Sequence, residues 1–156
     1  LPARTRRGTV EDLARLLHGI EPAGTPPLAP LLTVSGGAQR LVVVSYMLGD
    51  TGDLLRRAGP LAAGGRELYA IHLVHALEAD PPHAAVLAVD PEQPGLRRPL
   101  TRDTRRAYLA TFEEWRRETA RAWREAGATY VEVVTTEPVG HAVRRIVAPG
   151  MAGARP

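Results

Sequence analysis

The chain has 156 residues, 20 basic and 17 acidic side chains, a formal net charge of +3 and no cysteine. A chain of this length fits one domain with its own hydrophobic core, and without cysteine it has no thiolate zinc site and no cysteine nucleophile. All 20 basic residues are arginine, which excludes a Walker A lysine and a Schiff-base lysine.

Hydrophobic periodicity predicts alternating helices and strands along the chain. Helical spacing of apolar residues predicts helices at residues 9–20, 54–63 and 104–126 and after residue 138, with a turn or two of helix at 28–34. Unbroken apolar runs predict strands buried on both faces near residues 41–47, 68–74 and 129–135. A β-hairpin is expected from residues 84–89 and 96–100. This order predicts an α/β fold, a parallel sheet flanked by helices.

Capping residues and helix breakers indicate where the helices begin and end. Thr9 is expected to cap the first helix, with Asp12 as its capping-box partner. Asp53 is expected to cap the helix after the first strand. Pro60 weakens the second half of that helix, and Gly127 ends the longest one.

Aromatic residues gather in the long helix. Tyr108, Phe112 and Trp115 recur at helical spacing, and Trp123 widens the same face. Such a stripe is more often core than a cofactor site, so we expect it to pack on the sheet with Trp115 largely buried. The i,i+4 ion pairs expected on the opposite side are Glu113 with Arg117 and Arg121 with Glu125.

The sequence contains no motif of a known active site. Ser35 and Ser45 are the only serines, and neither lies in a Gly-x-Ser-x-Gly elbow. No Gly-x-Gly-x-x-Gly fingerprint follows a predicted strand. His72 and His75 are three residues apart, which in a strand places them on opposite faces and argues against a zinc pair. We therefore expect no catalytic residue, no cofactor, no metal site and no enzymatic activity.

Two other functions stay open. Six Arg-Arg doublets are spread along the chain, and a nucleic-acid-binding module would place them on phosphates, but we favour solvated helix faces as the explanation. A small-molecule enzyme would need a pocket at the carboxyl ends of the strands, around Ser45, Tyr46, Asp50 and His75. Asp50 and Asp53 also suit a turn and a helix cap.

Six short segments follow one another in a recognisable order. They are Leu1-Pro2-Ala3-Arg4 with the helix after it, residues 40–48, residues 73–82 with Glu78, Asp90-Pro91-Glu92-Gln93-Pro94-Gly95, Arg105-Arg106-Ala107-Tyr108 and Thr135-Thr136-Glu137-Pro138. This ordered set resembles the family called domain of unknown function 58, whose globular part is a von Willebrand factor A-like domain. The resemblance implies that residues 1–148 form the carboxyl-terminal part of such a domain, with a Rossmann-like parallel sheet and a hairpin insertion, and that 149–156 are a loose tail.

The resemblance also bears on metal binding. Von Willebrand factor A domains commonly hold a divalent cation through an Asp-x-Ser-x-Ser strand end, a loop threonine and an aspartate after a later strand. The Asp-x-Ser-x-Ser element is missing from this chain, and Tyr46 stands after Ser45 where the aspartate is expected. Thr25, after Gly24, matches the loop threonine. The resemblance thus implies a degenerate site that binds no metal.

A bacterial, non-enzymatic protein-interaction domain is the function that the resemblance implies. Genes of this family commonly lie beside that of a MoxR-type AAA+ ATPase, which implies a chaperone-like partnership with that ATPase. The residues expected on the interaction surface are Thr25, Ser45, Tyr46, Asp50 and Asp53.

The expected location is the cytoplasm. No signal peptide is visible, and no apolar run approaches the roughly 20 residues of a membrane-spanning helix. We expect neither a membrane nor a nucleic-acid partner, and because the chain begins with Leu1 rather than Met we expect a piece of a longer protein.

The strand at residues 41–48 has one more expected property. In a von Willebrand factor A sheet its inner neighbour is the strand with Asp-x-Ser-x-Ser, which this chain lacks, so residues 41–48 should form an edge. They are apolar and carry no charge, and such an edge invites pairing with another strand. We therefore expect self-association or pairing with another chain through residues 41–48.

Overall fold

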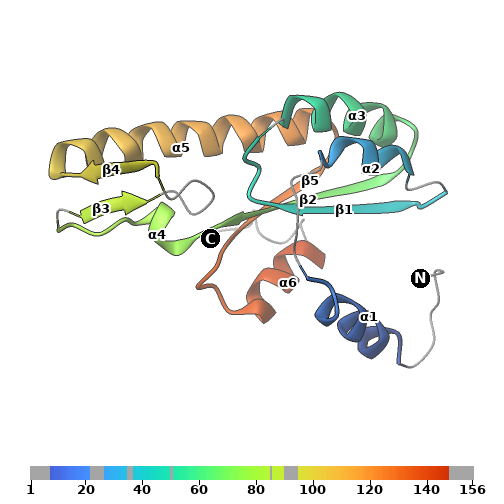
Figure 1. Cartoon of the computed structure of the whole chain (residues 1–156). Coiled ribbons are helices and arrows are strands. Elements are labelled where there is room, and N and C mark those ends of the chain that lie inside the picture. Colours follow the sequence, from blue (N-terminus) through green and yellow to red (C-terminus); the bar gives the residue numbers. More distant parts are fainter. Residues whose placement is uncertain are drawn as a thin grey trace, which may run out of the picture.

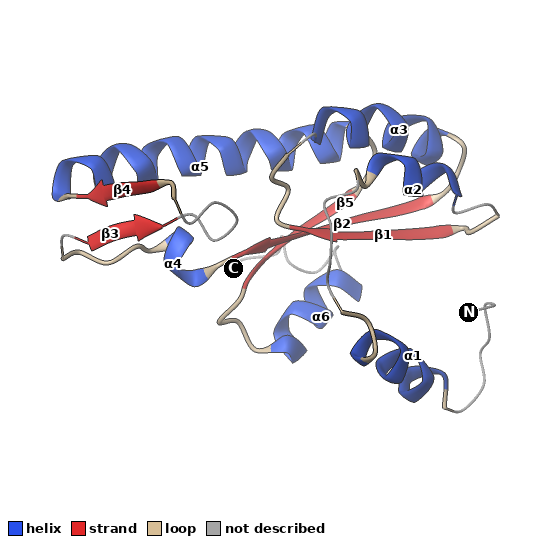
Figure 2. Cartoon of the chain, in the orientation of Figure 1, coloured by secondary structure: helices blue, strands red, loops and turns tan. Residues whose placement is uncertain are grey.

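A computed structural model of the chain describes residues 8–21, 27–34, 37–49, 51–84, 86–89 and 95–147. Three parallel strands form the main sheet in the order β1-β2-β5, and an antiparallel pair, β3-β4, lies apart from it (Figure 1). The helices are α1 (Thr9–His18), α2 (Ala29–Val34), α3 (Thr51–Ala63), α4 (Ala76–Ala79), α5 (Arg102–Glu125) and α6 (Val139–Val147). The strands are β1 (Arg40–Ser45), β2 (Glu67–Val74), β3 (Val86–Val89), β4 (Arg97–Leu100) and β5 (Thr129–Val134) (Figure 2).

The predicted α/β architecture, a parallel sheet flanked by helices, is confirmed. The register of β1 on β2 runs from Arg40↔Glu67 to Ser45↔His72, and that of β2 on β5 from Tyr69↔Thr129 to Val74↔Val134. Where the sequence predicts a hairpin, β3 and β4 pair antiparallel. Within the described residues β1 pairs only with β2. The first strand therefore lies at an edge of the sheet, as predicted.

The main core lies between one face of the sheet and the helices α2, α3 and α5. Alternate residues of β1, Leu41 and Val43, point into it, because successive side chains of a strand point to opposite faces. Helix α3 adds Leu54 and Ala58, and α5 adds Trp123, whose side chain is fully buried. This face is covered along its whole width.

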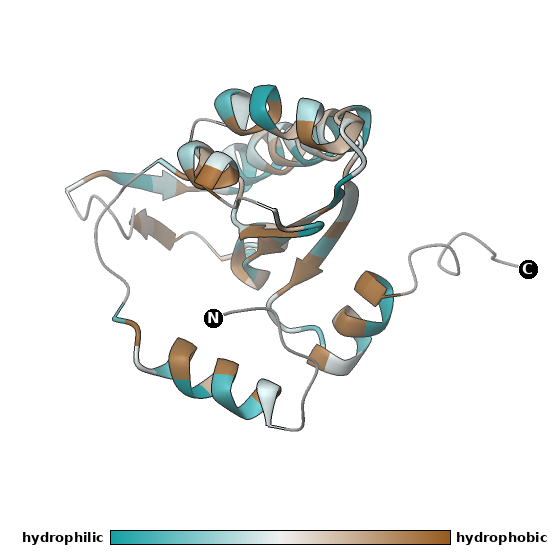
Figure 3. Cartoon of the chain, turned by 90° about the vertical axis from the view of Figure 1, so that its right-hand side faces the viewer, coloured by the Kyte–Doolittle hydropathy of each residue, from teal (hydrophilic) through white to brown (hydrophobic). Residues whose placement is uncertain are grey.

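The opposite face of the sheet is only partly covered. Helix α6 packs on the β5 side, where Ala142 meets Val131 and Val133 in a second, smaller core. On the β1 side the same face carries Val42 and Val44, which are 52% and 55% exposed. Helix α1 lies on this side of the sheet too (Figures 1 and 3), but none of its residues is buried.

Trp115 packs against the main core, as predicted, and is partly buried. Trp123, on the same side of α5, is the more deeply buried of the two and has no exposed surface. The 24 residues of α5 span about 36 Å, longer than the strands of six to eight residues on which it packs. Its amino-terminal half therefore runs past the sheet toward β3 and β4 (Figure 1). Only the carboxyl-terminal half, with Trp123, lies over the sheet.

On the exposed side of α5 one predicted ion pair forms and one is replaced. Arg121 lies 3.6 Å from Glu125, as predicted. Arg117 pairs with Glu114, three residues away, instead of Glu113, because residues three and four apart both lie within reach on a helix.

Two predicted helix caps are also wrong. The residue before α1 is Gly8 in a left-handed conformation (φ +89°), and Thr9 is the first helical residue with no side-chain cap. Asp53 is the third residue of α3, where its carboxylate accepts hydrogen bonds from Arg56 and Arg57. An acidic residue in the first turn stabilises a helix through its dipole without capping it. Pro60 lies inside α3 without ending it.

Candidate functional site

The structure places three of the five predicted interaction residues, and two of these lie at the carboxyl end of β1. Ser45, Tyr46 and Asp53 belong to the described residues, whereas Thr25 and Asp50 lie outside them, as do the tail at 149–156 and the segment before residue 8. The structure therefore brings Ser45 and Tyr46 together at the strand end. It does not test whether Thr25 and Asp50 join them.

Ser45 has a structural task in the turn after β1. Its Oγ accepts a hydrogen bond from the N–H of Met47 at 3.0 Å, and the Thr51 hydroxyl donates to the Met47 carbonyl at 2.9 Å. Met47 is buried with φ 55°, a left-handed conformation that a side chain rarely adopts. These two bonds hold the chain in that conformation, so β1 ends at Ser45 rather than near residue 48 as predicted.

His75 has a comparable local task. Its Nδ1 accepts from the N–H of Leu77 at 3.2 Å, and its own N–H donates to the Glu78 carboxylate at 3.0 Å. The pair forms a capping box on α4. Among the residues that the structure describes, no group of three side chains suits a metal ion.

A buried polar network crosses the sheet beneath α5. The imidazole of His72 on β2 is 1% exposed, and its Nδ1 lies 2.5 Å from the Tyr130 hydroxyl on β5. The Glu132 carboxylate is 4.0 Å from the same nitrogen, and Trp115 packs against the ring edge-on, with centroids 5.2 Å apart. Sequence analysis did not single out His72 for this role, because the pattern could not show that Tyr130 on a different strand faces it.

The ionisation of this network points to a structural role. Burial lowers the pKa of His72, which the Glu132 carboxylate and a hydrogen bond to the backbone of Tyr46 only partly oppose. Burial, with the Glu132 carboxylate, raises the pKa of Tyr130 well above its usual value. The neutral imidazole of His72 therefore accepts a hydrogen bond from the Tyr130 hydroxyl, which stays protonated. Neither group is suited to transfer a proton near neutral pH. The pair joins the central strand to β5.

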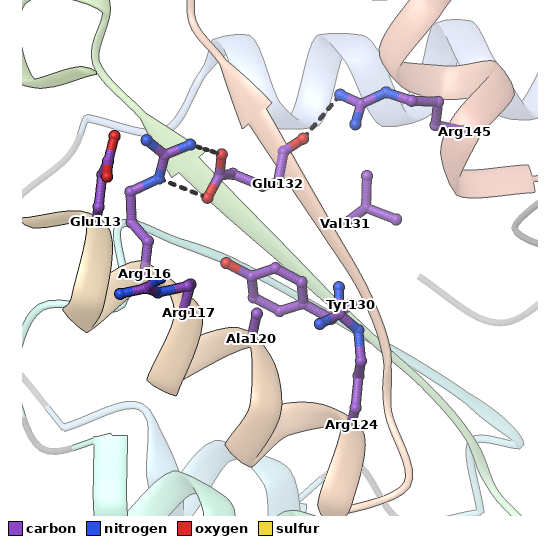
Figure 4. Close-up of a pocket in the computed structure, with 9 residues that line it drawn as sticks. All are labelled: Glu113, Arg116, Arg117, Ala120, Arg124, Tyr130, Val131, Glu132 and Arg145. Atoms are coloured by element: carbon purple, nitrogen blue, oxygen red, sulfur yellow. Dashed lines mark hydrogen bonds and ion pairs between the residues drawn. The ribbon is translucent and has the colours of Figure 1, made fainter. Parts of the chain in front are cut away.

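A cleft opens at the outer edge of β5, between α5 and α6 (Figure 4). Its volume is about 740 Å³, and it is lined by Glu113, Arg116, Arg117, Ala120, Arg124, Tyr130, Val131, Glu132 and Arg145. The arginines come from two helices that are distant in sequence. Sequence analysis assigned the Arg-Arg doublets to solvated helix faces, and the doublets at 116–117 and 144–145 were the only signal of this cleft.

Ion pairs organise one side of this cleft. Arg116 holds the Glu132 carboxylate through two nitrogens, its Nε at 2.8 Å, and this pairing raises the pKa of Arg116. Arg145 donates to the Glu132 carbonyl at 2.7 Å and also pairs with Glu137. Arg124 lies over the ring of Tyr130, 5.2 Å from its centroid.

The opposite edge of the sheet is apolar. Val42 and Val44 are half exposed beside the unpaired side of β1, and Tyr46 and Leu48 continue the exposed apolar surface beyond the strand end. Helix α1 carries apolar residues, coloured brown in Figure 3, and none of them is buried. The exposed apolar residues of α1, with Ile20 just beyond the helix, are Val10, Leu13, Leu16, Leu17 and Ile20. An exposed apolar surface of this extent is typical of an interaction site.

The chain matches no protein-family model, no curated protein and no solved structure. Within the described ranges, no helix combines the length and apolar character needed to cross a membrane. The likeness to the domain of unknown function 58 family therefore stays a prediction from the sequence.

Proposed function

We propose that this chain is a non-enzymatic protein-interaction domain that binds its partner at the edge of β1. The single observation that carries the proposal is the apolar edge itself. Val42 and Val44 are half exposed on a strand that has one neighbour within the described chain.

Parallel sheets in α/β proteins are normally covered on both faces. β1 has its Leu41–Val43 face buried and its Val42–Val44 face open. An edge strand also presents unpaired backbone N–H and C=O groups, and natural proteins protect such edges with charges, prolines or bulges. Arg40 is the only charged residue of β1, and it is paired with Glu67. The rest of the strand is open to pairing.

A partner that adds a strand and an apolar covering element would use both features. Its backbone would pair with the outer edge of β1, and its side chains would cover Val42 and Val44, with a gain of about 1 kcal/mol for each half-exposed valine. The uncovered stripe of α1 lies on the same side of the sheet (Figure 3) and extends the apolar surface that such a partner would meet.

The partner that the family resemblance favours is a MoxR-type AAA+ ATPase in the cytoplasm, in a chaperone-like assembly. In the absence of that partner, a second copy of the chain would pair at the same edge. Both occupants use residues 41–48, so one variant tests them together.

Val44→Arg tests the proposal, because a charge on the open face of an edge strand opposes pairing. Val34→Arg is the matched control: Val34 is 78% exposed on α2, the helix that packs on the opposite face of the sheet from Val42 and Val44. Sedimentation velocity measures self-association of the full chain, and biolayer interferometry measures binding to a purified MoxR-type ATPase.

We expect the wild-type chain and Val34→Arg to associate and bind alike, and Val44→Arg to lose both properties while its circular dichroism is unchanged. A wild-type chain that stays monomeric and does not bind the ATPase would contradict the proposal. Equal losses in the two variants would also contradict it, because they would indicate a general effect of added charge.

A further inference from the structure

The cleft at the outer edge of β5 carries an excess of positive charge. Four of its lining side chains are arginines and two are glutamates, which leaves a charge of +2. The side chains come from α5, β5 and α6, so the cleft depends on how these three elements pack (Figure 4). It lies at the edge of the sheet opposite to the apolar edge of β1.

Of the two glutamates that line the cleft, Glu132 is engaged within the chain, and so are the neighbouring acceptors on Glu137 and Val134. The Glu132 carboxylate is held by Arg116, and its carbonyl accepts from Arg145. The Glu137 carboxylate also accepts from Arg145, and the Val134 carbonyl accepts from the N–H of Glu137 at 2.8 Å. The carbonyls of Glu132 and Val134 therefore already accept hydrogen bonds within the chain, which disfavours the pairing of another strand with the outer edge of β5.

Donors, in contrast, remain in surplus. A guanidinium has five N–H donors and no acceptor. Within the described residues the Arg124 guanidinium forms no ion pair and lies over the ring of Tyr130. Arg117 pairs with Glu114 on an exposed surface, where such a pair contributes little and is readily exchanged. The cleft is therefore matched by a ligand that only accepts hydrogen bonds and carries negative charge.

The size of the ligand follows from the charges along α5. Glu113, Glu114 and Glu118 alternate with the arginines of this helix. A long polyanion such as a nucleic-acid strand would place phosphates beside these carboxylates, at an electrostatic cost. A compact dianion fits between them, and the cleft of about 740 Å³ has the volume of a small-molecule site.

We propose that the cleft between α5, β5 and α6 binds a small phosphate monoester, with Arg124 and Arg117 as its principal ligands and Arg116 and Arg145 held in place by Glu132. This site is separate from the β1 edge and does not depend on the function proposed for that edge.

Isothermal titration calorimetry on the full chain tests this site, in a phosphate-free buffer at low salt, with phenyl phosphate and inorganic phosphate as probes. We expect one site per chain. Arg124→Ala removes charge-assisted hydrogen bonds and should raise the Kd for phenyl phosphate at least about tenfold. Arg124→Lys should recover part of the affinity, because it keeps the charge but not the planar fork.

Arg121→Ala is the matched control. Arg121 is on the same helix, exposed and paired with Glu125, and does not line the cleft, so its removal should leave the Kd unchanged. Equal losses in Arg124→Ala and Arg121→Ala would overturn the proposal, because they would show binding to net charge alone. Absence of wild-type binding at millimolar phenyl phosphate would overturn it too.

A ten-nucleotide oligothymidylate completes the experiment. Tighter binding of this oligonucleotide than of phenyl phosphate, with the same loss in Arg124→Ala, would overturn the proposal in favour of a nucleic-acid site. Binding of phenyl phosphate with little or no binding of the oligonucleotide would support it.

Discussion

Replacement of Trp123 tests the packing of α5 on the sheet. Its side chain is fully buried in the main core, among residues from β1, β2 and α3. Trp123→Ala should lower the free energy of unfolding by about 3–5 kcal/mol, the usual cost of removing a buried tryptophan. Because small domains are stable by only about 5–15 kcal/mol, this variant will lose much of its stability.

Two further substitutions sharpen the test. Trp115 is partly buried against the same core, so Trp115→Ala should cost less than Trp123→Ala, about 2–3 kcal/mol. The Nε1–H of Trp123 is buried and has no hydrogen-bond partner within the described part of the chain. Trp123→Phe removes this donor, whose unpaired burial costs about 1–3 kcal/mol, and thereby offsets the lost packing. Its net cost should stay below about 1.5 kcal/mol.

Urea denaturation followed by circular dichroism measures all three variants against the wild-type chain. The expected order of destabilisation is Trp123→Ala, then Trp115→Ala, then Trp123→Phe. If Trp123→Ala unfolds at the wild-type urea concentration, or if Trp115→Ala is the more damaging of the two alanine variants, the described docking of α5 is wrong.

Two other predictions concern a buried histidine and a helix end. Because burial lowers the pKa of His72 below the usual value of 6.5 for histidine, the unfolded chain binds a proton more readily than the folded one. The free energy of unfolding should therefore fall as the pH drops below about 6.5, by up to about 1.4 kcal/mol per pH unit. Urea denaturation midpoints at pH 7.5 and 5.5 measure this fall. If His72→Gln loses as much stability between the two pH values as the wild-type chain, His72 is not its cause. Gly127 and Gly65 both have a positive φ, +82° and +85°, but differ in the space around them. A Cβ at Gly127 would lie 2.9 Å from the Cβ of Ala62, whereas a Cβ at Gly65 would meet no atom within 4 Å. Gly127→Ala should therefore cost more than the roughly 1 kcal/mol expected of Gly65→Ala, and equal thermal shifts would refute the close contact with Ala62.

Much of the fold follows from local sequence patterns. Unbroken apolar runs located β1, β2 and β5 and indicated that they are parallel. The burial on both faces that these runs predicted is wrong for β1, whose Val42 and Val44 are half exposed. Helical periodicity located α5 and α6, since the apolar stripe of a helix recurs every three to four residues. The residues that cap the amino termini of the helices were predicted less well. Thr9 and Asp53 are typical capping residues that lie one and three positions inside their helices.

Which residues meet across the structure was decided only by tertiary packing. Trp115 and Trp123 share one periodic stripe, but Trp123 is fully enclosed by the main core, whereas Trp115 packs edge-on against His72 and stays partly exposed. His72 is paired in register with Glu132, and it meets Tyr130 because Tyr130 lies two residues before Glu132 on the same face of β5, 58 residues from His72 in sequence. The arginine cleft gathers residues from α5 and α6 around β5, and no local pattern encodes that meeting. Periodicity reports which side of an element is apolar, whereas contacts between distant elements depend on their lengths, register and packing, which exist only in the folded chain.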